Sequence, residues 1–342
     1  MRVFVFSCLL LLFSSSYAQK DTLNQLDAKG KKTGYWKKVE NGKLIYEGRF
    51  LNDRPTGTFK YYYPDGKLKS ETTFLKGTEK VYTVIYHPNQ KIASQGIYLD
   101  QQRDSIWNYF NDKGMLLETV TLKKGIKSGG RKIYNKDNGQ LICEENYKND
   151  TLDGAKKLWY ESGDLYLVSN YKKGILDGAY EIYHEGQKPY VKGTYANNNK
   201  VKIWSYYTTT GELRKIEDFT KNPKYPEITL VFMSNGKPVK FKMEDFAYFM
   251  QKDGSTMDIY TRDGNKHVVK GNLGDVTTYL HVLFCPITEK ILATRSAIAS
   301  HKKISSNEVQ VFLKPALPFD IILEGEQAQL FLLFMNQEAP KE

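Results

Sequence analysis

Aromatic and apolar residues alternate with lysine along much of the chain, and turn-forming residues interrupt the alternation at regular intervals. The segment 57–68 reads Gly-Thr-Phe-Lys-Tyr-Tyr-Tyr-Pro-Asp-Gly-Lys-Leu. Alternation with a period of two predicts a half-buried β-strand, and glycine in the turn accepts a positive φ that other residues resist. The segment 67–74 then predicts the returning strand, so we expect each unit to form a β-hairpin.

One turn position recurs through the chain at intervals of 24 or 25 residues: Gly42, Gly66, Gln90, Gly114, Gly139, Gly163, Gln187 and Gly211. A fixed period of this length is typical of repeat architectures, in which each unit buries its aromatic face against its neighbours. The sequence therefore predicts eight hairpins in an elongated meander over residues 20–219. Glutamine at the turn position predicts distorted turns in the third and seventh units. Open repeat ends expose strand edges, so we expect residues 20–33 and the C-terminal module to cap them.

The 24-residue rhythm ends at two prolines within residues 220–226, which predict a linker before a separate module at 227–342. Strands are predicted at 228–232, 238–241, 246–251, 257–261 and 267–270. Asn272 is a candidate cap for a short helix through Leu280, and residues 324–335 fit a helix or a strand. The predicted fold class is mainly β, an antiparallel hairpin repeat followed by a small, mostly β, α/β domain.

The N-terminal residues predict export. Arg2 precedes an apolar stretch from Val3 to Phe13 and a small, polar segment at 14–18, so residues 1–19 fit a signal peptide cleaved after Ala18 or Gln19. A lipoprotein signal peptide with Cys8 as the lipidated cysteine is an alternative, but the residues around Cys8 fit such a signal poorly. No later segment approaches 18 consecutive apolar residues, so we expect a periplasmic or secreted protein without a further transmembrane segment.

The repeated phrase resembles a known family. Gly-x-(Trp/Phe)-x-x-(Tyr/Trp), then Asp-Gly-Lys-Leu or Ser-Gly-Asp-Leu, then an aromatic residue with Lys-Gly or Asn-Asp, is similar to the MORN repeat variant over roughly residues 30–219. The resemblance implies a binding architecture. Because some exported bacterial proteins with this variant are antitoxin components, it also implies a toxin-neutralising protein as an alternative.

The C-terminal module resembles a second family. Segments 243–249, 259–273 and 294–298 are similar to the LytTR-type module, a mainly β DNA-binding domain. The resemblance implies Arg295, Lys302 and Lys303 as phosphate contacts if the signal peptide is misread. Residues 221–342 carry 15 Lys and Arg against 14 Asp and Glu, which gives little of the attraction that nonspecific DNA affinity requires.

Most of the net charge of +11 lies in residues 1–220, which carry 35 Lys and Arg against 25 Asp and Glu. Lysines that alternate with aromatic residues predict a basic stripe for an anionic glycan, lipid head groups or an acidic protein, or simply a solvated strand face. The candidate contacts are Lys37, Lys60, Lys67, Lys156, Lys157, Lys172 and Lys173. The tryptophans predict either packing between repeats or an exposed aromatic platform: Trp36, Trp107, Trp159 and Trp204.

Catalytic motifs are missing from the sequence, including a nucleophile elbow, a phosphate loop and a zinc-binding His-Glu-x-x-His. His87 and His184 occupy equivalent repeat positions, which favours a structural role. Cys143 and Cys285 predict two buried thiols or one disulfide. We therefore expect a non-enzymatic protein without a cofactor, a metal site or a small-molecule substrate, which binds a protein or an anionic envelope component.

Overall fold

The computed structural model describes residues 23–280 and 284–336, and the chain divides into two compact units, Met1–Gly139 and Gln140–Glu342. Both units are mainly β, so the predicted fold class is confirmed. The predicted signal peptide at 1–19 lies outside the described residues. Within those residues, no helix is both long and apolar enough to cross a membrane.

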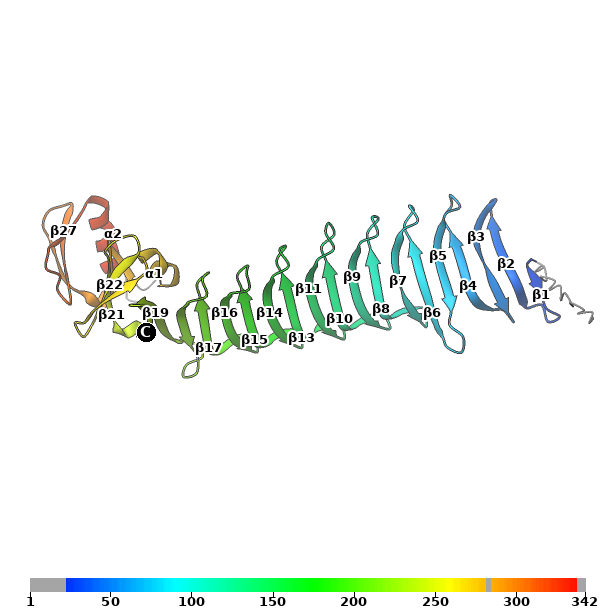
Figure 1. The fold of residues 1–342 in the computed structure, drawn as a ribbon, viewed down its shortest axis with the longest axis horizontal. Helices are drawn as coiled ribbons and strands as arrows, with labels where there is room; N and C mark the ends of the chain where they lie inside the picture. The colour runs from blue at the N-terminus through cyan, green and yellow to red at the C-terminus, as the bar shows by residue number, and fades with distance from the viewer. Residues whose placement is uncertain (1–22, 281–283, 337–342) are drawn as a thin grey trace, which may run out of the picture. The chain divides into compact units, whose positions relative to one another are not determined.

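The first unit is an antiparallel meander in which each strand pairs with the next one along the chain (Figure 1). The strands are β1 (Gln25–Leu26), β2 (Lys32–Glu40), β3 (Lys43–Leu51), β4 (Arg54–Tyr62), β5 (Leu68–Phe74), β6 (Lys80–Tyr86), β7 (Ile92–Leu99), β8 (Gln102–Phe110), β9 (Leu116–Lys123) and β10 (Ile126–Tyr134). Four of the predicted hairpins therefore lie here, as β2–β3, β4–β5, β6–β7 and β8–β9.

The second unit begins with strands of the same kind, and the boundary between the units falls at the turn of the fifth predicted hairpin. The strands are β11 (Leu141–Lys148), β12 (Thr151–Leu152), β13 (Gly154–Trp159), β14 (Leu165–Lys172), β15 (Ile175–Tyr183), β16 (Pro189–Ala196), β17 (Asn199–Tyr207) and β18 (Leu213–Asp218). Hairpins β13–β14, β15–β16 and β17–β18 carry the last three predicted turns.

Residues 220–226, predicted as a linker, belong to the connection between two paired strands. Strand β18 pairs with β19 (Glu227–Ser234) in the register Lys215↔Leu230 to Asp218↔Glu227. The sheet of the last repeat thus extends into the C-terminal module. The module continues with β20 (Lys237–Lys242), η1 (Met243–Asp245), β21 (Phe246–Gln251), β22 (Thr256–Thr261), β23 (Lys266–Lys270), α1 (Leu273–Leu280), β24 (Phe284–Thr288), β25 (Ile291–Thr294), η2 (Arg295–Ala297), β26 (Ile298–Lys303), β27 (Glu308–Leu313), β28 (Ile321–Glu324) and α2 (Gly325–Asn336).

The core of the C-terminal module is built around β21, where Phe246, Ala247, Tyr248 and Phe249 are fully buried. Two hydrophobic clusters meet at this strand, and one of them includes the three-stranded sheet β26–β28 and α2. The ambiguous segment 324–335 is mostly helix, while the predicted strands and the short helix capped by Asn272 are present.

The turns show why glutamine can replace glycine in two repeats. Gln90 and Gln187 adopt φ of +67° and +63°, in the same left-handed region as Gly66 at +87°. The Gln90 N–H donates to His87 O at 2.8 Å, as the Gly66 N–H donates to Tyr63 O at 2.9 Å. The prediction of a distorted turn is therefore wrong for the third unit. In the seventh unit the Gln187 N–H still donates to His184 O at 3.1 Å, but Gly186 also adopts a positive φ of +81°, so the shape of that turn differs. The Gln90 side chain also donates to Leu68 O at 3.0 Å, which helps to offset the strained backbone.

Asn24 covers the exposed edge of β2. Its side-chain amide donates to Lys37 O at 3.1 Å and accepts from the Lys37 N–H at 2.8 Å, as a neighbouring strand would. The backbone N–H of Asn24 donates to Tyr35 O at 2.9 Å. Because unpaired strand edges recruit other chains, this contact confirms the predicted cap at the N-terminal side of the repeats.

Side chains at one turn position bind the backbone of the following repeat. Tyr63 OH donates to Tyr86 O at 2.8 Å, and His87 Nε2 lies 3.0 Å from Phe110 O, to which it can donate. The predicted structural role of His87 is thereby confirmed. Cys143 and Cys285 are buried thiols that form no disulfide with each other, and burial raises the pKa of Cys285 to about 11.

Candidate functional site

Aromatic rings cover one face of the repeat sheet, which we call the packing face. Trp107 on β8 and Trp204 on β17 are 0% and 2% exposed, and Phe59 on β4 is 2% exposed. Each of these rings lies directly over a glycine of the preceding strand. A Cβ added to Gly96 would lie 2.4 Å from Trp107 Cδ2, so glycine is what allows the ring to close against the sheet.

The column of rings is interrupted in the third repeat of the first unit. Positions 59, 83 and 107 are equivalent by the 24-residue spacing, and Thr83 stands between Phe59 and Trp107. The glycine position on the neighbouring strand β5 is also changed, because Thr72 replaces the glycines found at 48 and 96. Thr72 and Thr83 are paired across β5 and β6, and their hydroxyl oxygens lie 3.1 Å apart. Two small polar side chains therefore occupy the place of one ring.

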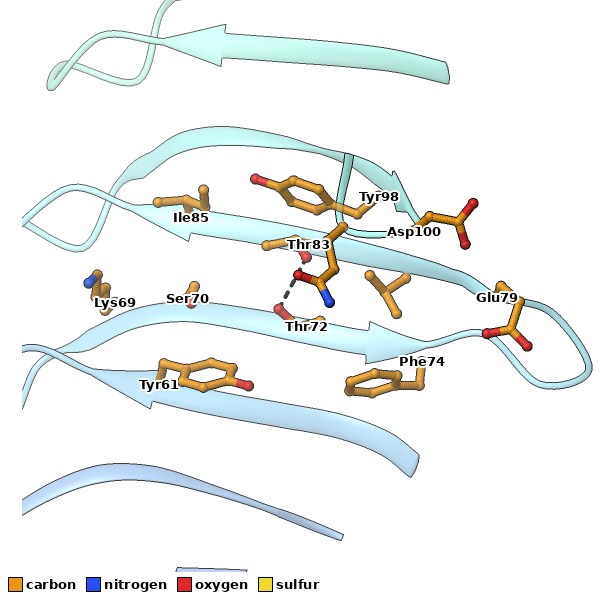
Figure 2. A pocket seen from close by; sticks show the side chains of 12 residues that line it. Tyr61, Lys69, Ser70, Thr72, Phe74, Glu79, Thr83, Ile85, Tyr98 and Asp100 are labelled. Carbon is orange, nitrogen blue, oxygen red and sulfur yellow. Dashed lines mark hydrogen bonds between the residues drawn. The ribbon is translucent and has the colours of Figure 1, made fainter. Parts of the chain in front are cut away.

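This interruption leaves a cavity of about 710 Å³ over β4 to β7, which we call the Thr83 groove. Figure 2 shows the Thr72–Thr83 pair at its centre, with aromatic side chains on both sides. The lining residues are Tyr61, Lys69, Ser70, Thr72, Phe74, Glu79, Val81, Thr83, Ile85, Tyr98, Asp100 and Gln101. All of them belong to the first unit.

Charged groups lie at the two ends of the Thr83 groove (Figure 2). Lys69 lies at one end, and Glu79 and Asp100 lie at the other. Asp100 Oδ2 is 3.6 Å from Lys124 Nζ, but both side chains are about 60% exposed, at 61% and 58%, so the pair is weak. The groove therefore has aromatic walls, a threonine pair at its centre and an acidic end.

The predicted lysines on the opposite face are matched by carboxylates. Strands β2 to β5 align Lys37, Glu47, Lys60 and Glu71 in one cross-strand row. Lys37 Nζ lies 3.1 Å from Glu47, and Lys60 Nζ lies 3.5 Å from Glu71. Burial raises the pKa of Glu47, but hydrogen bonds from Tyr62, Tyr35 and Lys37 outweigh burial and hold it below its usual value. This cross-strand row therefore carries little net charge.

The other predicted lysines are dispersed. Lys67 lies 3.4 Å from Asp65 in its own turn, and Lys156 lies 3.0 Å from Glu145. Lys157 is half-buried opposite Glu144, while Lys172 and Lys173 are exposed at the end of β14. The structure brings Lys37 and Lys60 onto one face, but it does not gather the seven lysines into one unpaired basic surface.

The predicted tryptophans serve packing to different degrees. Trp107 and Trp204 are buried, and their indole N–H groups donate to Ile97 O at 2.9 Å and Thr194 O at 3.2 Å. These two rings have almost no surface to offer a partner. Trp36 and Trp159 are half-buried.

Of the predicted phosphate contacts, Arg295 is engaged within the module. Its guanidinium donates to Phe334 O at 3.0 Å and to Met335 O at 2.5 Å, where it caps the last turn of α2. Lys302 and Lys303 are exposed on β26.

In the second unit, the packing face carries polar side chains in contact with one another. Glu217 accepts hydrogen bonds from Lys200 Nζ at 3.0 Å, Lys215 Nζ at 2.8 Å and Tyr206 OH at 2.5 Å. Lys215 Nζ also lies 4.2 Å from the centre of the Tyr206 ring. These groups satisfy one another, so the cluster stabilises the last hairpin.

Sequence reasoning missed the Thr83 groove. The groove exists because one aromatic ring is missing from the column. The sequence feature that could have revealed it is Thr83, which lies 24 residues from an aromatic residue on either side. The change at Thr72 is meaningful only once the strand register pairs it with Thr83.

The family comparison identifies one repeat directly. The MORN repeat variant matches residues 55–76, which include most of β4 and all of β5, so the predicted resemblance is confirmed there. Repeats of this kind often act as scaffolds that bind proteins or membranes. A search of curated proteins gives no match.

Comparison with solved structures gives only weak likenesses. The LytTr DNA-binding domain of a putative methyl-accepting/DNA response regulator from Bacillus cereus is 9% identical, with a TM-score of 0.27 over 32% of this chain and 97% of that chain. A GtfA/B complex bound to UDP and GlcNAc is 12% identical, with a TM-score of 0.16 over 47% of this chain and 27% of that chain. A TcdB2-TccC3-Cdc42 structure is 11% identical, with a TM-score of 0.20 over 84% of this chain and 16% of that chain. None of these likenesses carries an argument about fold or function.

Proposed function

We propose that this chain is an exported, non-enzymatic repeat scaffold that binds a protein partner through the Thr83 groove. The observation that carries the proposal is the interruption of the column of rings between Phe59 and Trp107. Phe59 and Trp107 are buried at equivalent positions, whereas the face between them is hollow and lined by half-buried aromatic side chains. Concave, mostly apolar surfaces with a few polar groups are where proteins bind ligands.

The charge distribution favours a protein over an anionic surface. An anionic glycan or lipid surface would need unpaired cations on one face, yet Lys37 and Lys60 lie within 3.5 Å of carboxylates. The Thr83 groove itself has two carboxylates at one end against one lysine at the other. Its acidic end repels phosphate and carboxylate groups, and its aromatic walls suit a protein segment.

Export is part of the proposal and rests on the N-terminal pattern of a basic residue, an apolar stretch and a small, polar exit. Sequencing of the mature N-terminus from an extracytoplasmic fraction tests it. We expect the chain to begin at Gln19 or Lys20. A chain that keeps Met1 and remains in the cytoplasm would refute export.

Site-specific photo-cross-linking in the native cells tests the binding role. Benzoylphenylalanine would replace Tyr61 in the groove or, as the matched control, Tyr82 on the other face of β6, which is 37% exposed. We expect one discrete protein adduct from position 61 and none of that mass from position 82. Equal adducts from both positions, or no protein adduct from position 61, would contradict the proposal.

A further inference from the structure

We propose that the Thr83 groove binds an extended protein segment that inserts one aromatic side chain into the empty place in the column, with a basic residue of the segment beside Glu79 and Asp100. This inference rests on the proposed function and specifies the chemistry of the partner.

The size of the empty place comes from the strand spacing. Phe59 lies over Gly48 of β3 and Trp107 lies over Gly96 of β7, because a Cβ atom added to either glycine would lie within 3 Å of the ring. Strands β5 and β6 therefore carry no large ring at the column position, and only Thr72 and Thr83 stand there. Neighbouring strands are about 4.8 Å apart, so the uncovered width is on the order of 14 Å, which accommodates one aromatic side chain and its backbone.

The walls provide the contacts that an inserted ring needs. Tyr61, Phe74 and Tyr98 are half-buried aromatic side chains, and each already packs against a ring of the column or beside it. Phe59 and Phe74 have centroids 5.6 Å apart, and Tyr98 and Trp107 have centroids 4.9 Å apart. Aromatic pairs favour such edge-to-face and offset separations of about 4.5–7 Å. An inserted ring would therefore continue the packing on both sides.

The floor favours an aromatic side chain over a sugar. Thr72 and Thr83 hydrogen-bond to each other at 3.1 Å, so their hydroxyl groups are partly satisfied without a ligand. A sugar ring carries several hydroxyl groups, each of which loses a water partner on binding and requires a replacement. The apolar lining residues Val81 and Ile85 offer none. An apolar ring loses no hydrogen bonds there.

The acidic end selects the neighbouring residue of the partner. Glu79 and Asp100 line the same end of the groove, and both are exposed. A lysine or arginine of the bound segment would lie beside two carboxylates, which accelerates association and fixes the direction of the segment.

A labelled-peptide titration tests the inference. The probes are a fluorescein-labelled Thr-Trp-Thr-Arg peptide and its counterpart with alanine in place of tryptophan, added to the full mature chain and followed by anisotropy. We expect the alanine peptide to bind at least tenfold more weakly. We also expect Glu79→Gln/Asp100→Asn to weaken the tryptophan peptide severalfold and to reduce its sensitivity to salt.

A filled groove is the decisive variant. Thr72→Gly/Thr83→Trp introduces the residue types of the Gly96–Trp107 pair, and circular dichroism checks that the variant folds. Thr73→Trp is the matched control, because it places the same indole on the opposite face of β5. We expect the tryptophan peptide to lose binding to the filled variant and to keep it with the control.

The inference is overturned if the filled variant binds the peptide as well as the wild-type chain does, or if neither peptide binds. It is also overturned if cello-oligosaccharides bind the wild-type groove and are displaced by filling it, whereas the peptides are not. A protein adduct at position 61 together with failed peptide binding would leave the scaffold proposal standing and remove only the aromatic-insertion mechanism.

Discussion

Substitution of Gly96 by alanine tests how the repeats close their packing face. The added Cβ would lie 2.4, 2.5 and 2.7 Å from Cδ2, Cε2 and Cγ of Trp107. The indole cannot withdraw easily, because it is fully buried and its N–H donates to Ile97 O at 2.9 Å. Overpacking costs about 1–3 kcal/mol and a lost hydrogen bond about 1 kcal/mol, so we expect the free energy of unfolding to fall by about 2–4 kcal/mol.

The matched control is Gly130→Ala in β10 of the same unit. Its Cβ meets nothing within 4 Å, and its φ lies outside the left-handed region, so the change should be neutral or stabilising by about 0.5–1 kcal/mol. The assay is urea unfolding followed by far-ultraviolet circular dichroism and tryptophan fluorescence. If Gly96→Ala and Gly130→Ala unfold within about 0.5 kcal/mol of each other, the packing argument is wrong.

The β5–β6 pair suggests how the clash can be relieved. There, threonine occupies both the glycine and the aromatic position, as Thr72 and Thr83. The double substitution Gly96→Thr/Trp107→Thr copies this arrangement. Because the two side chains are in contact, we expect the double variant to be less destabilised than the sum of the single ones by about 1 kcal/mol or more. Strict additivity would show that the two positions are not coupled.

Three further predictions concern the edge, the last hairpin and the C-terminal helix. Asn24→Ala removes two hydrogen bonds to Lys37, so we expect a loss of about 1–2 kcal/mol and concentration-dependent association through β2, measured by analytical ultracentrifugation; an unchanged monomer would contradict the edge-cap role. Burial alone would raise the pKa of Glu217, but hydrogen bonds from Lys215, Tyr206 and Lys200 outweigh burial, so the pKa in the folded protein is lowered. The stabilisation that Glu217 contributes is therefore present above its unfolded pKa of about 4.3 and is lost as the pH falls through the lower folded pKa. Glu217→Gln should therefore flatten the fall in melting temperature below about pH 4, and an unchanged pH profile would count against this cluster. Arg295→Met should destabilise α2 by about 1–3 kcal/mol in hydrogen exchange, whereas Lys302→Met should not, and equal effects would remove the capping role of Arg295.

The repeats could be predicted because their signals are local. Each turn glycine lies within a few residues of the alternating strands on either side of it. Only Gln90, which stands at the turn position that Gly66 occupies one repeat earlier, misled the prediction. Glutamine was expected to distort the turn, yet its side chain bonds to Leu68 O and the backbone keeps the left-handed φ. The hairpin β19–β20 was predictable for the same reason, since Asn235-Gly236 marks its turn.

The parts that escaped prediction depend on distant residues. Strands β24 to β28 are short and lack regularly spaced turn signals. Their apolar residues could therefore not be assigned to individual strands before the segment that fits a helix or a strand. The pairing of Lys37 with Glu47 and of Lys60 with Glu71 requires the register between strands, which single-strand periodicity does not contain. The capping role of Arg295 requires the position of a helix that ends 40 residues later.

Hydrogen exchange of the mature chain, with and without the protein captured by cross-linking at Tyr61, tests the central claim most directly. Binding in the Thr83 groove predicts added protection of the backbone amides of β4 to β7, and loss of that protection in Thr72→Gly/Thr83→Trp. Protection confined to other strands, or protection of β4 to β7 that survives filling of the groove, would contradict the account.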